Sequence, residues 1–189
     1  NNMSTFSDPA VWLSSTASDV AALQAAHYFR TKFRLKSPVA KAVLRYSALG
    51  VVEPWLNGMR VSDDFFTPGW SDYRKRAYVC SYEVGERLQI GDNCLGVVLA
   101  DGWAGAPFGP KGHAVAFAPR AMFVAELEVI YVDGSREVIS TTKDWHWRKG
   151  AILKNSIYNG ETYDARKAIP DWASEVSSAR GWKAVEVVP

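Results

Sequence analysis

An Asn-Gly dipeptide between apolar runs constrains the fold of this chain more than any other feature. Asn57-Gly58 follows the apolar residues 51–56 and precedes Met59-Arg60-Val61. Asn and Gly both tolerate a positive φ, which the two-residue turn of a β-hairpin requires. Residues 42–49 form another apolar run just before this stretch. The segment 45–73 therefore predicts antiparallel strands against which the rest of the chain packs.

Short extended segments recur along the rest of the chain. Residues 94–100 are almost continuously apolar, as in a strand buried on both faces. Asp133-Gly134 predicts a second hairpin. Other segments suited to strands begin at residue 27 and lie at residues 40–49, 77–84, 122–132, 136–140 and 151–157. About nine short strands predict an all-β fold, an antiparallel β-sandwich of jelly-roll type with short helical turns near the termini.

The length of 189 residues suits one domain with a sizeable core. Residues 1–26 are rich in Ser, Asp and Ala and are expected to be a lead-in segment, with a short helix over 19–26. Residues 27–172 form the predicted sandwich, and 173–189 a linker into a following module. The long irregular segment 101–119 contains four Gly and three Pro, and such loops often carry function.

Composition excludes several classes of partner. The net charge of +2 is too small and too evenly spread for a nucleic-acid or membrane-surface protein. The sequence contains no run of ~20 apolar residues, the length of a membrane span. Cys80 and Cys94 both lie in apolar runs, so buried free thiols are expected, with a single disulfide between neighbouring strands as the alternative.

Aromatic side chains are numerous, with eight each of Trp, Tyr and Phe. They suit a β-sheet core, and they also suit a surface on which flat rings stack against sugars. Trp70 and Tyr73, in the segment WSDYR, are interpreted either as stacking aromatics at a binding edge or as a corner that packs its own rings.

Two loops collect polar groups that a sandwich does not need for folding. In Asp101-Gly102-Trp103, a carboxylate and an indole could bind a sugar, or Trp103 could pack at the end of the sandwich. In the second loop, Glu161, Asp164 and Arg166 are close enough for a charged cluster. Two carboxylates can act as acid and base in glycoside hydrolysis. However, an odd separation places Glu161 and Asp164 on opposite faces of a strand, which favours a structural or interdomain salt bridge.

No cofactor motif occurs in the sequence. It contains no phosphate-binding glycine loop, no HExxH helix and no nucleophile elbow, and its three His are scattered. A Ca²⁺ ion bound by loop oxygens is compatible with such a fold, but no EF-hand pattern supports it. We therefore predict no catalytic residue, no metal ligand and no cofactor within this chain.

Four segments, in this order, resemble the N-terminal β-sandwich domain of bacterial α-L-rhamnosidases. They read LGVVEPWLNGMRV, FFTPGWSDYRKRAYVCSYEV, GDNCLGVVLADGW and NGETYDAR. The resemblance covers about residues 27–172, and GWKAV from Gly181 is similar to the passage into the next module of those enzymes. It implies a parent glycosidase that hydrolyses terminal α-L-rhamnosides with inversion, through acidic residues of a separate (α/α)₆ catalytic barrel.

The resemblance implies a non-catalytic accessory domain that packs on the following domains, including the barrel, and helps to shape substrate access. Related domains bind rhamnose through Ca²⁺ with an Asp-Asn pair, but Ser47-Ala48-Leu49-Gly50 stands at that place here, so the metal site is not transferred. An independent lectin-like module for rhamnose-containing glycans is the alternative, and a self-sufficient hydrolase is a third hypothesis. The candidate substrate or interdomain edge comprises Asp101, Trp103, Glu161, Asp164 and Arg166.

Overall fold

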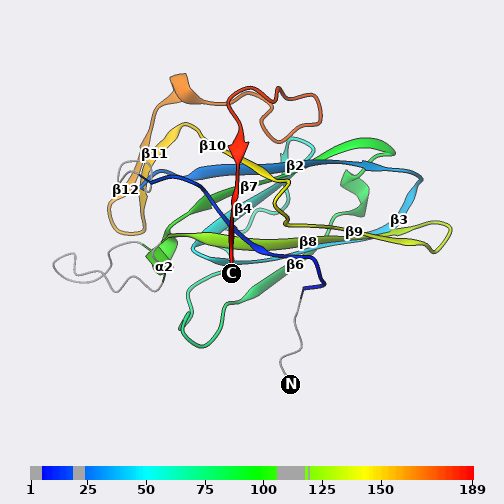
Figure 1. The fold of residues 1–189 in the computed structure, drawn as a ribbon, viewed down its shortest axis with the longest axis horizontal. Helices are drawn as coiled ribbons and strands as arrows, with labels where there is room; N and C mark the ends of the chain where they lie inside the picture. Colours follow the sequence, from blue (N-terminus) through cyan, green and yellow to red (C-terminus); the bar gives the residue numbers. More distant parts are fainter. Residues whose placement is uncertain (1–5, 19–23, 106–117, 119) are drawn as a thin grey trace.

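The computed structural model describes residues 6–18, 24–105, 118 and 120–189. Within them, fourteen strands form two antiparallel sheets that pack face to face, and a separate hairpin. In Figure 1, β2 and β7 lie in one layer and β8 and β9 in the other, with β11, β12 and α2 at one end. The predicted all-β antiparallel sandwich is confirmed.

Sheet A is built around β8, which pairs with three strands. Its order is β14 (Glu186–Val188), β1 (Trp12–Ser14), β8 (Met122–Tyr131), β3 (Val39–Leu49) and β6 (Val79–Glu83), and β9 (Arg136–Ser140) also pairs with β8. Sheet B has the order β13 (Lys183–Ala184), β10 (His146–Lys149), β2 (His27–Leu35), β7 (Gly91–Ala100), β4 (Val51–Leu56) and β5 (Met59–Arg60).

Short elements complete the fold at its edges. The hairpin consists of β11 (Ile152–Ser156) and β12 (Gly160–Tyr163). The helical pieces are η1 (Gly85–Arg87), α2 (Gly102–Gly105) and η2 (Ala165–Lys167). None of the helices in the described part of the chain is long and apolar enough to cross a membrane.

Both predicted hairpins are present. Asn57 and Gly58 have φ of 49° and 83° and connect β4 to β5, and Gly134, with φ of 81°, lies between β8 and β9. The chain crosses from sheet A to sheet B at Gly50, whose φ is 140°. A Cβ there would lie 2.5 Å from the Ala100 carbonyl oxygen, so only glycine allows this close crossing.

The core lies between the two sheets and contains many of the aromatic side chains. Phe29 of β2 contacts Phe123 of β8 edge to face, at 5.0 Å between ring centroids, and Phe123 contacts Trp145 at 5.6 Å. Trp145 and Trp147 are almost completely buried. Their indole N–H groups donate to Ser140 O and Thr16 Oγ1, so neither buried nitrogen loses its hydrogen bond.

Both ends of the described chain enter the sheets. β1 pairs with β14, and β13 pairs with β10, so strands lie within the predicted lead-in and within the predicted linker. The domain boundaries at residues 26 and 172 remain a prediction. Most of the helix expected over 19–26, and most of the irregular segment after Gly105, fall outside the described residues.

The two cysteines are free thiols, as expected. Cys80 belongs to β6 of sheet A and is half-buried, whereas Cys94 belongs to β7 of sheet B and is buried. Burial raises the pKa of Cys94 to about 11, which keeps this thiol protonated near neutral pH.

Candidate functional site

The outer face of sheet B carries an aromatic cluster that the strand register brings together. Tyr28 and Arg30 of β2 point away from the core because Phe29, between them, belongs to it. Arg30 is aligned with Gly96 of β7, and Gly96 with Trp55 of β4. One cross-strand row therefore places the guanidinium of Arg30, the glycine at position 96 and the indole of Trp55 side by side.

The space over Gly96 is filled by an aromatic ring from the C-terminal part of the chain. Trp172 lies on Gly96, where an added Cβ would be 2.6 Å from its ring. The Trp172 ring contacts Tyr28 at 5.0 Å, in an edge-to-face arrangement, and Trp55 at 5.8 Å. Gly150 makes similar room for Tyr28, since a Cβ at Gly150 would be 2.3 Å from the tyrosine ring. Two glycines thus allow the rings to lie against the backbone.

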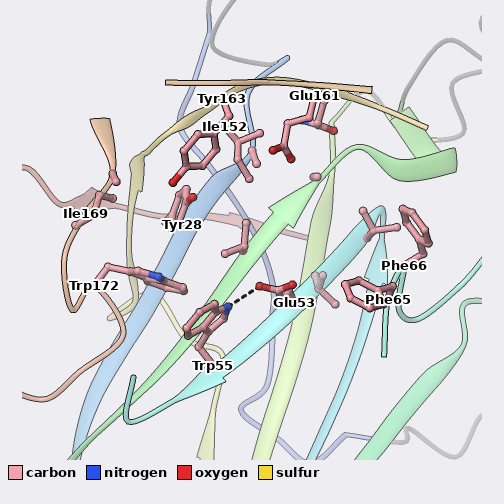
Figure 2. Close-up of a pocket in the computed structure, with 17 residues that line it drawn as sticks. Tyr28, Glu53, Trp55, Phe65, Phe66, Ile152, Glu161, Tyr163, Ile169 and Trp172 are labelled. Atoms are coloured by element: carbon pink, nitrogen blue, oxygen red, sulfur yellow. Dashed lines mark hydrogen bonds between the residues drawn. The ribbon is translucent and has the colours of Figure 1, made fainter. Parts of the chain in front are cut away.

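A pocket of about 390 Å³ opens beside this cluster, and we call it the Glu161 pocket. In Figure 2, Glu161 and Tyr163 of β12 lie across the pocket from Glu53 and Trp55, with Phe65 and Phe66 to one side. Its lining comprises Ala26, Tyr28, Val51, Val52, Glu53, Trp55, Phe65, Phe66, Val98, Ala100, Ile152, Asn155, Glu161, Tyr163, Ala168, Ile169 and Trp172.

The charged groups of the lining are both carboxylates. Glu53 is held in place, because it accepts a hydrogen bond of 2.8 Å from Trp55 Nε1 and pairs with Arg60 Nε at 3.1 Å. Glu161 is exposed and makes no hydrogen bond or ion pair with its side chain among the described residues. Burial raises the pKa of Tyr28 to about 12, and the negative charges of Tyr163, Glu161 and Glu53 add to this shift. The pocket is therefore apolar, aromatic and anionic.

Exposed aromatic side chains surround the mouth of the pocket. Phe65 and Phe66 are 71% and 61% exposed, and Tyr163 is 55% exposed. Phe66 contacts the ring of Trp103, at 6.0 Å between centroids. Exposed rings grouped in this way are typical of surfaces that bind a partner.

On the same face of sheet B, a second site is occupied by side chains of the chain itself. The Arg30 guanidinium lies 4.0 Å from the Trp182 ring centroid and donates to the carbonyl oxygens of Trp172 and Ser178 at 3.0 and 2.6 Å. Lys32 Nζ donates to the carbonyl oxygens of Glu175 and Ser177, both at 2.7 Å. We call Arg30, Lys32, Trp182 and segment 172–182 the Trp182 clamp.

Asp101 and Trp103, predicted from the first loop, lie close to the Glu161 pocket. The backbone N–H of Asp101 donates to Oδ1 of Asn155, a lining residue, at 3.3 Å. Burial raises the pKa of Asp101 to about 6. Trp103 belongs to α2 and reaches the pocket mouth through Phe66.

The predicted residues of the second loop have two different surroundings. Glu161 lines the pocket, whereas Asp164 and Arg166 pair with each other, at 2.8 Å from Arg166 Nε and 3.0 Å from Nη2 to the two carboxylate oxygens. Asp164 also accepts from the backbone N–H of Arg166, which caps η2. These hydrogen bonds lower the pKa of Asp164. The local role of this pair is to stabilise the turn after β12.

Trp70 and Tyr73 do not line the Glu161 pocket. Tyr73 is half-buried and its hydroxyl donates to Gly69 O at 3.2 Å, within the same corner. Trp70 is 59% exposed. Asp72, between them, pairs with Arg74 at 3.1 Å.

Sequence reasoning missed the cluster formed by Tyr28, Glu53, Trp55 and Trp172, which comes from three separate segments. One signal pointed toward it. Gly96 interrupts the apolar run of β7, and a glycine inside a buried strand often marks the close approach of another group.

No observation supports a Ca²⁺ ion at residues 47–50. Ser47 Oγ donates to Tyr78 O at 2.8 Å, and Ala48, Leu49 and Gly50 have no oxygen-bearing side chains. Within the described ranges, no group of three or more His, Cys, Asp or Glu side chains is arranged to hold a metal ion. These residues do not fit the ion, and we derive no chemistry through it.

Comparison with known proteins identifies similar sequences and structures. The family model described as "Alpha-L-rhamnosidase N-terminal domain" matches residues 37–189. An α-L-rhamnosidase from Streptomyces avermitilis is 40% identical over 162 residues, which are 85% of this chain and 16% of that protein.

Two solved structures have the same fold. The α-L-rhamnosidase of Streptomyces avermitilis complexed with L-rhamnose has a TM-score of 0.84 and 39% identity, and the match covers 87% of this chain and 16% of that one. The native enzyme of Aspergillus terreus has a TM-score of 0.92 and 29% identity, covering 96% and 21%. The chain thus spans about a fifth or less of these relatives.

Proposed function

Because the chain belongs to the α-L-rhamnosidase N-terminal domain family, we propose that it is a non-catalytic accessory domain of an α-L-rhamnosidase. It packs on the other modules of the same polypeptide, including an (α/α)₆ catalytic barrel, and helps to shape substrate access. One observation carries this proposal: the family match takes up residues 37–189, yet the chain spans 16% to 21% of the relatives compared. Most of such an enzyme lies outside the matched part.

The carboxylates near the pocket support a role in binding or packing. Hydrolysis of a glycoside by two carboxylates needs an acid and a base that both face the scissile bond. Asp164 is tied to Arg166, and Glu53 is tied to Arg60 and Trp55. Asp101 lies beside the pocket but is not part of its lining. This leaves Glu161 as the unengaged carboxylate of the pocket lining in the described part of the chain.

A direct assay tests the lack of catalysis. The 189-residue chain and its Glu161→Gln variant are incubated with an aryl α-L-rhamnoside, and release of the chromophore is followed. We expect both proteins to leave the uncatalysed rate unchanged. Turnover by the wild-type chain that disappears in the variant would contradict the proposal.

The packing role is tested in the full-length enzyme. The double substitution F65S/F66S removes the exposed rings at the pocket mouth and is expected to speed proteolysis at the junction after residue 189. Tyr78→Ser removes another exposed ring, 45% exposed and followed directly by β6, and serves as the matched control. Equal proteolysis of the two variants and the wild type would count against packing through this surface.

A lectin-like module is the second candidate, favoured by the Trp103 and Phe66 rings beside a recess of about 330 Å³. Aromatic rings and nearby polar groups are common in sugar sites. Titration with L-rhamnose, with and without Ca²⁺, separates the two candidates. Saturable binding that is lost in Trp103→Ala would support the lectin, and no binding would support the accessory domain.

A further inference from the structure

The Glu161 pocket combines aromatic rings and carboxylates but has no basic residue in its lining. In Figure 2, Tyr28, Trp55 and Trp172 lie on one side of the pocket with Tyr163 beside Tyr28, and Phe65 and Phe66 lie on the other side. Aromatic faces and carboxylates both attract cations, and the attraction strengthens where water is partly excluded. The chemistry of the lining therefore favours a positively charged group.

The polar groups that would bind a neutral ligand are largely occupied. Both oxygens of Glu53 are taken, by Trp55 and Arg60. Asn155 accepts from Asp101 N–H through Oδ1 and donates to Gln24 O through Nδ2 at 2.9 Å. Glu161 keeps its acceptor capacity on the opposite wall. Besides the hydroxyl groups of Tyr28 and Tyr163, the group of the lining left for recognition is the Glu161 carboxylate, which is anionic.

In the Trp182 clamp, an aromatic ring and oxygen acceptors already bind a cation of the chain itself. There the Arg30 guanidinium stacks on an indole and donates to oxygen acceptors around its edge. Arg60 likewise lies 4.8 Å from the Phe65 ring while it pairs with Glu53. Phe65 and Glu53 line the Glu161 pocket, so Arg60 already occupies that side of it, whereas the rings of Trp55 and Trp172 and the Glu161 carboxylate have no cation partner among the described residues.

We propose that the Glu161 pocket binds the guanidinium or ammonium group of a basic side chain from a docking polypeptide. The volume of about 390 Å³ is sufficient for such a side chain. The exposed Phe65, Phe66 and Tyr163 would cover the apolar flanks of the docked segment. Arginine with surrounding aromatic residues is a frequent anchor in protein interfaces.

This inference goes beyond the accessory role, and its failure is distinguishable from failure of that role. Loss of cation binding would leave the rhamnoside assay unchanged. Turnover of the rhamnoside would refute the accessory role without affecting cation binding.

The test uses NMR titration of the 189-residue chain with N-acetyl-arginine amide and, separately, with N-acetyl-citrulline amide. Citrulline has nearly the same shape as arginine but no charge. Glu161→Gln removes the carboxylate at an exposed position, so its fold should be intact, as checked by its backbone amide spectrum. Glu86→Gln removes an exposed carboxylate of η1 that is not part of the pocket lining, and it is the matched control.

We expect saturable binding of the arginine probe, about tenfold weaker binding of the citrulline probe, and a similar loss for the arginine probe in Glu161→Gln. Glu86→Gln should bind like the wild type, and added salt should weaken binding. Equal affinity for both probes would overturn the proposal, as would unchanged arginine binding in Glu161→Gln. Saturation of the pocket by L-rhamnose that arginine amide fails to displace would also overturn it.

Discussion

The Trp182 clamp and the Glu161 pocket lie on the same face of sheet B and share Trp172, yet they differ in one component. In the clamp, Arg30 is 5% exposed and satisfies the carbonyl oxygens of the segment that covers it. In the pocket, Phe65, Phe66 and Tyr163 are exposed, and so is Glu161. The lining contains no basic residue, and the neighbouring Arg60 pairs with Glu53 and not with Glu161. Where the chain supplies its own cation the site is structural, and where it does not the site is available to a partner.

The largest effect is expected from breaking the clamp. Arg30→Met leaves the carbonyl oxygens of Trp172 and Ser178 without their donors, and an unsatisfied buried group costs about 1–3 kcal/mol. We therefore expect the free energy of unfolding to fall by about 4 kcal/mol in urea titrations. Arg34→Met, on the same strand but in an exposed ion pair with Asp92, should change it by less than about 0.5 kcal/mol. Similar losses in both variants would show that the clamp adds no stability.

The second largest effect on stability is expected at Asp101, a partly buried carboxyl group near the Glu161 pocket. Asp101 has no basic partner among the described residues, unlike buried Glu126, which contacts Arg45 at 3.4 Å and the Ser7 N–H at 2.7 Å. Since burial raises the pKa of Asp101 to about 6, the folded chain keeps a proton that the unfolded chain releases near pH 4. Stability from this group is full below about pH 4 and is lost as the pH rises through 6.

Asp101→Asn removes this dependence. At pH 8 the variant should be more stable than the wild type by up to about 3 kcal/mol, and the two should agree near pH 4. Urea unfolding at a series of pH values measures the difference. A constant difference across the range would exclude Asp101 as its source.

A smaller loss of stability is expected from Gly96→Ala. Gly96 lies under Trp172, a residue that belongs to both sites. The added methyl group would meet the Trp172 ring at 2.6 Å and the Ala173 Cβ at 2.9 Å. Displacing the ring should lower the free energy of unfolding by about 2 kcal/mol. In a Trp172→Leu background the cost of Gly96→Ala should shrink, as a double-mutant cycle would show. Strict additivity would mean that the ring does not depend on the glycine.

The smallest effect is an electrostatic change in the pKa of Tyr28. Glu161→Gln removes one of the negative charges that raise the pKa of Tyr28, so the pKa should fall from about 12. The ¹³Cζ signal of Tyr28 followed against pH reports this directly. Glu86→Gln should leave the titration unchanged, and an unchanged titration in Glu161→Gln would place the Glu161 carboxylate away from the pocket.

Local features of the sequence predicted local structure well. Asn57-Gly58 specifies its hairpin through two positive φ values. The role of Asp101, Trp103 and Glu161 as a substrate or interdomain edge stays a prediction. The aromatic cluster was not predictable in the same way. Trp172 contacts Arg30 across 142 residues, and only the strand register shows that Gly96 leaves the space between them.

Glu161 also illustrates this limit. The sequence groups it with Asp164 and Arg166, but the turn after β12 takes those two into a pair of their own and leaves Glu161 facing β4 and β2. Neighbours in sequence therefore differ in role, because Glu161 belongs to β12 whereas Asp164 and Arg166 belong to the cap and first turn of η2.

The comparison between the two sites is tested most directly by the indole N–H signals of Trp55, Trp172 and Trp182 during titration with N-acetyl-arginine amide. Trp55 and Trp172 line the open pocket, whereas Trp182 already carries Arg30. We predict that the signals of Trp55 and Trp172 shift to saturation while that of Trp182 stays unchanged. A shift of Trp182 equal to theirs, or no shift in any of the three, would contradict the distinction between a filled and an open cation site.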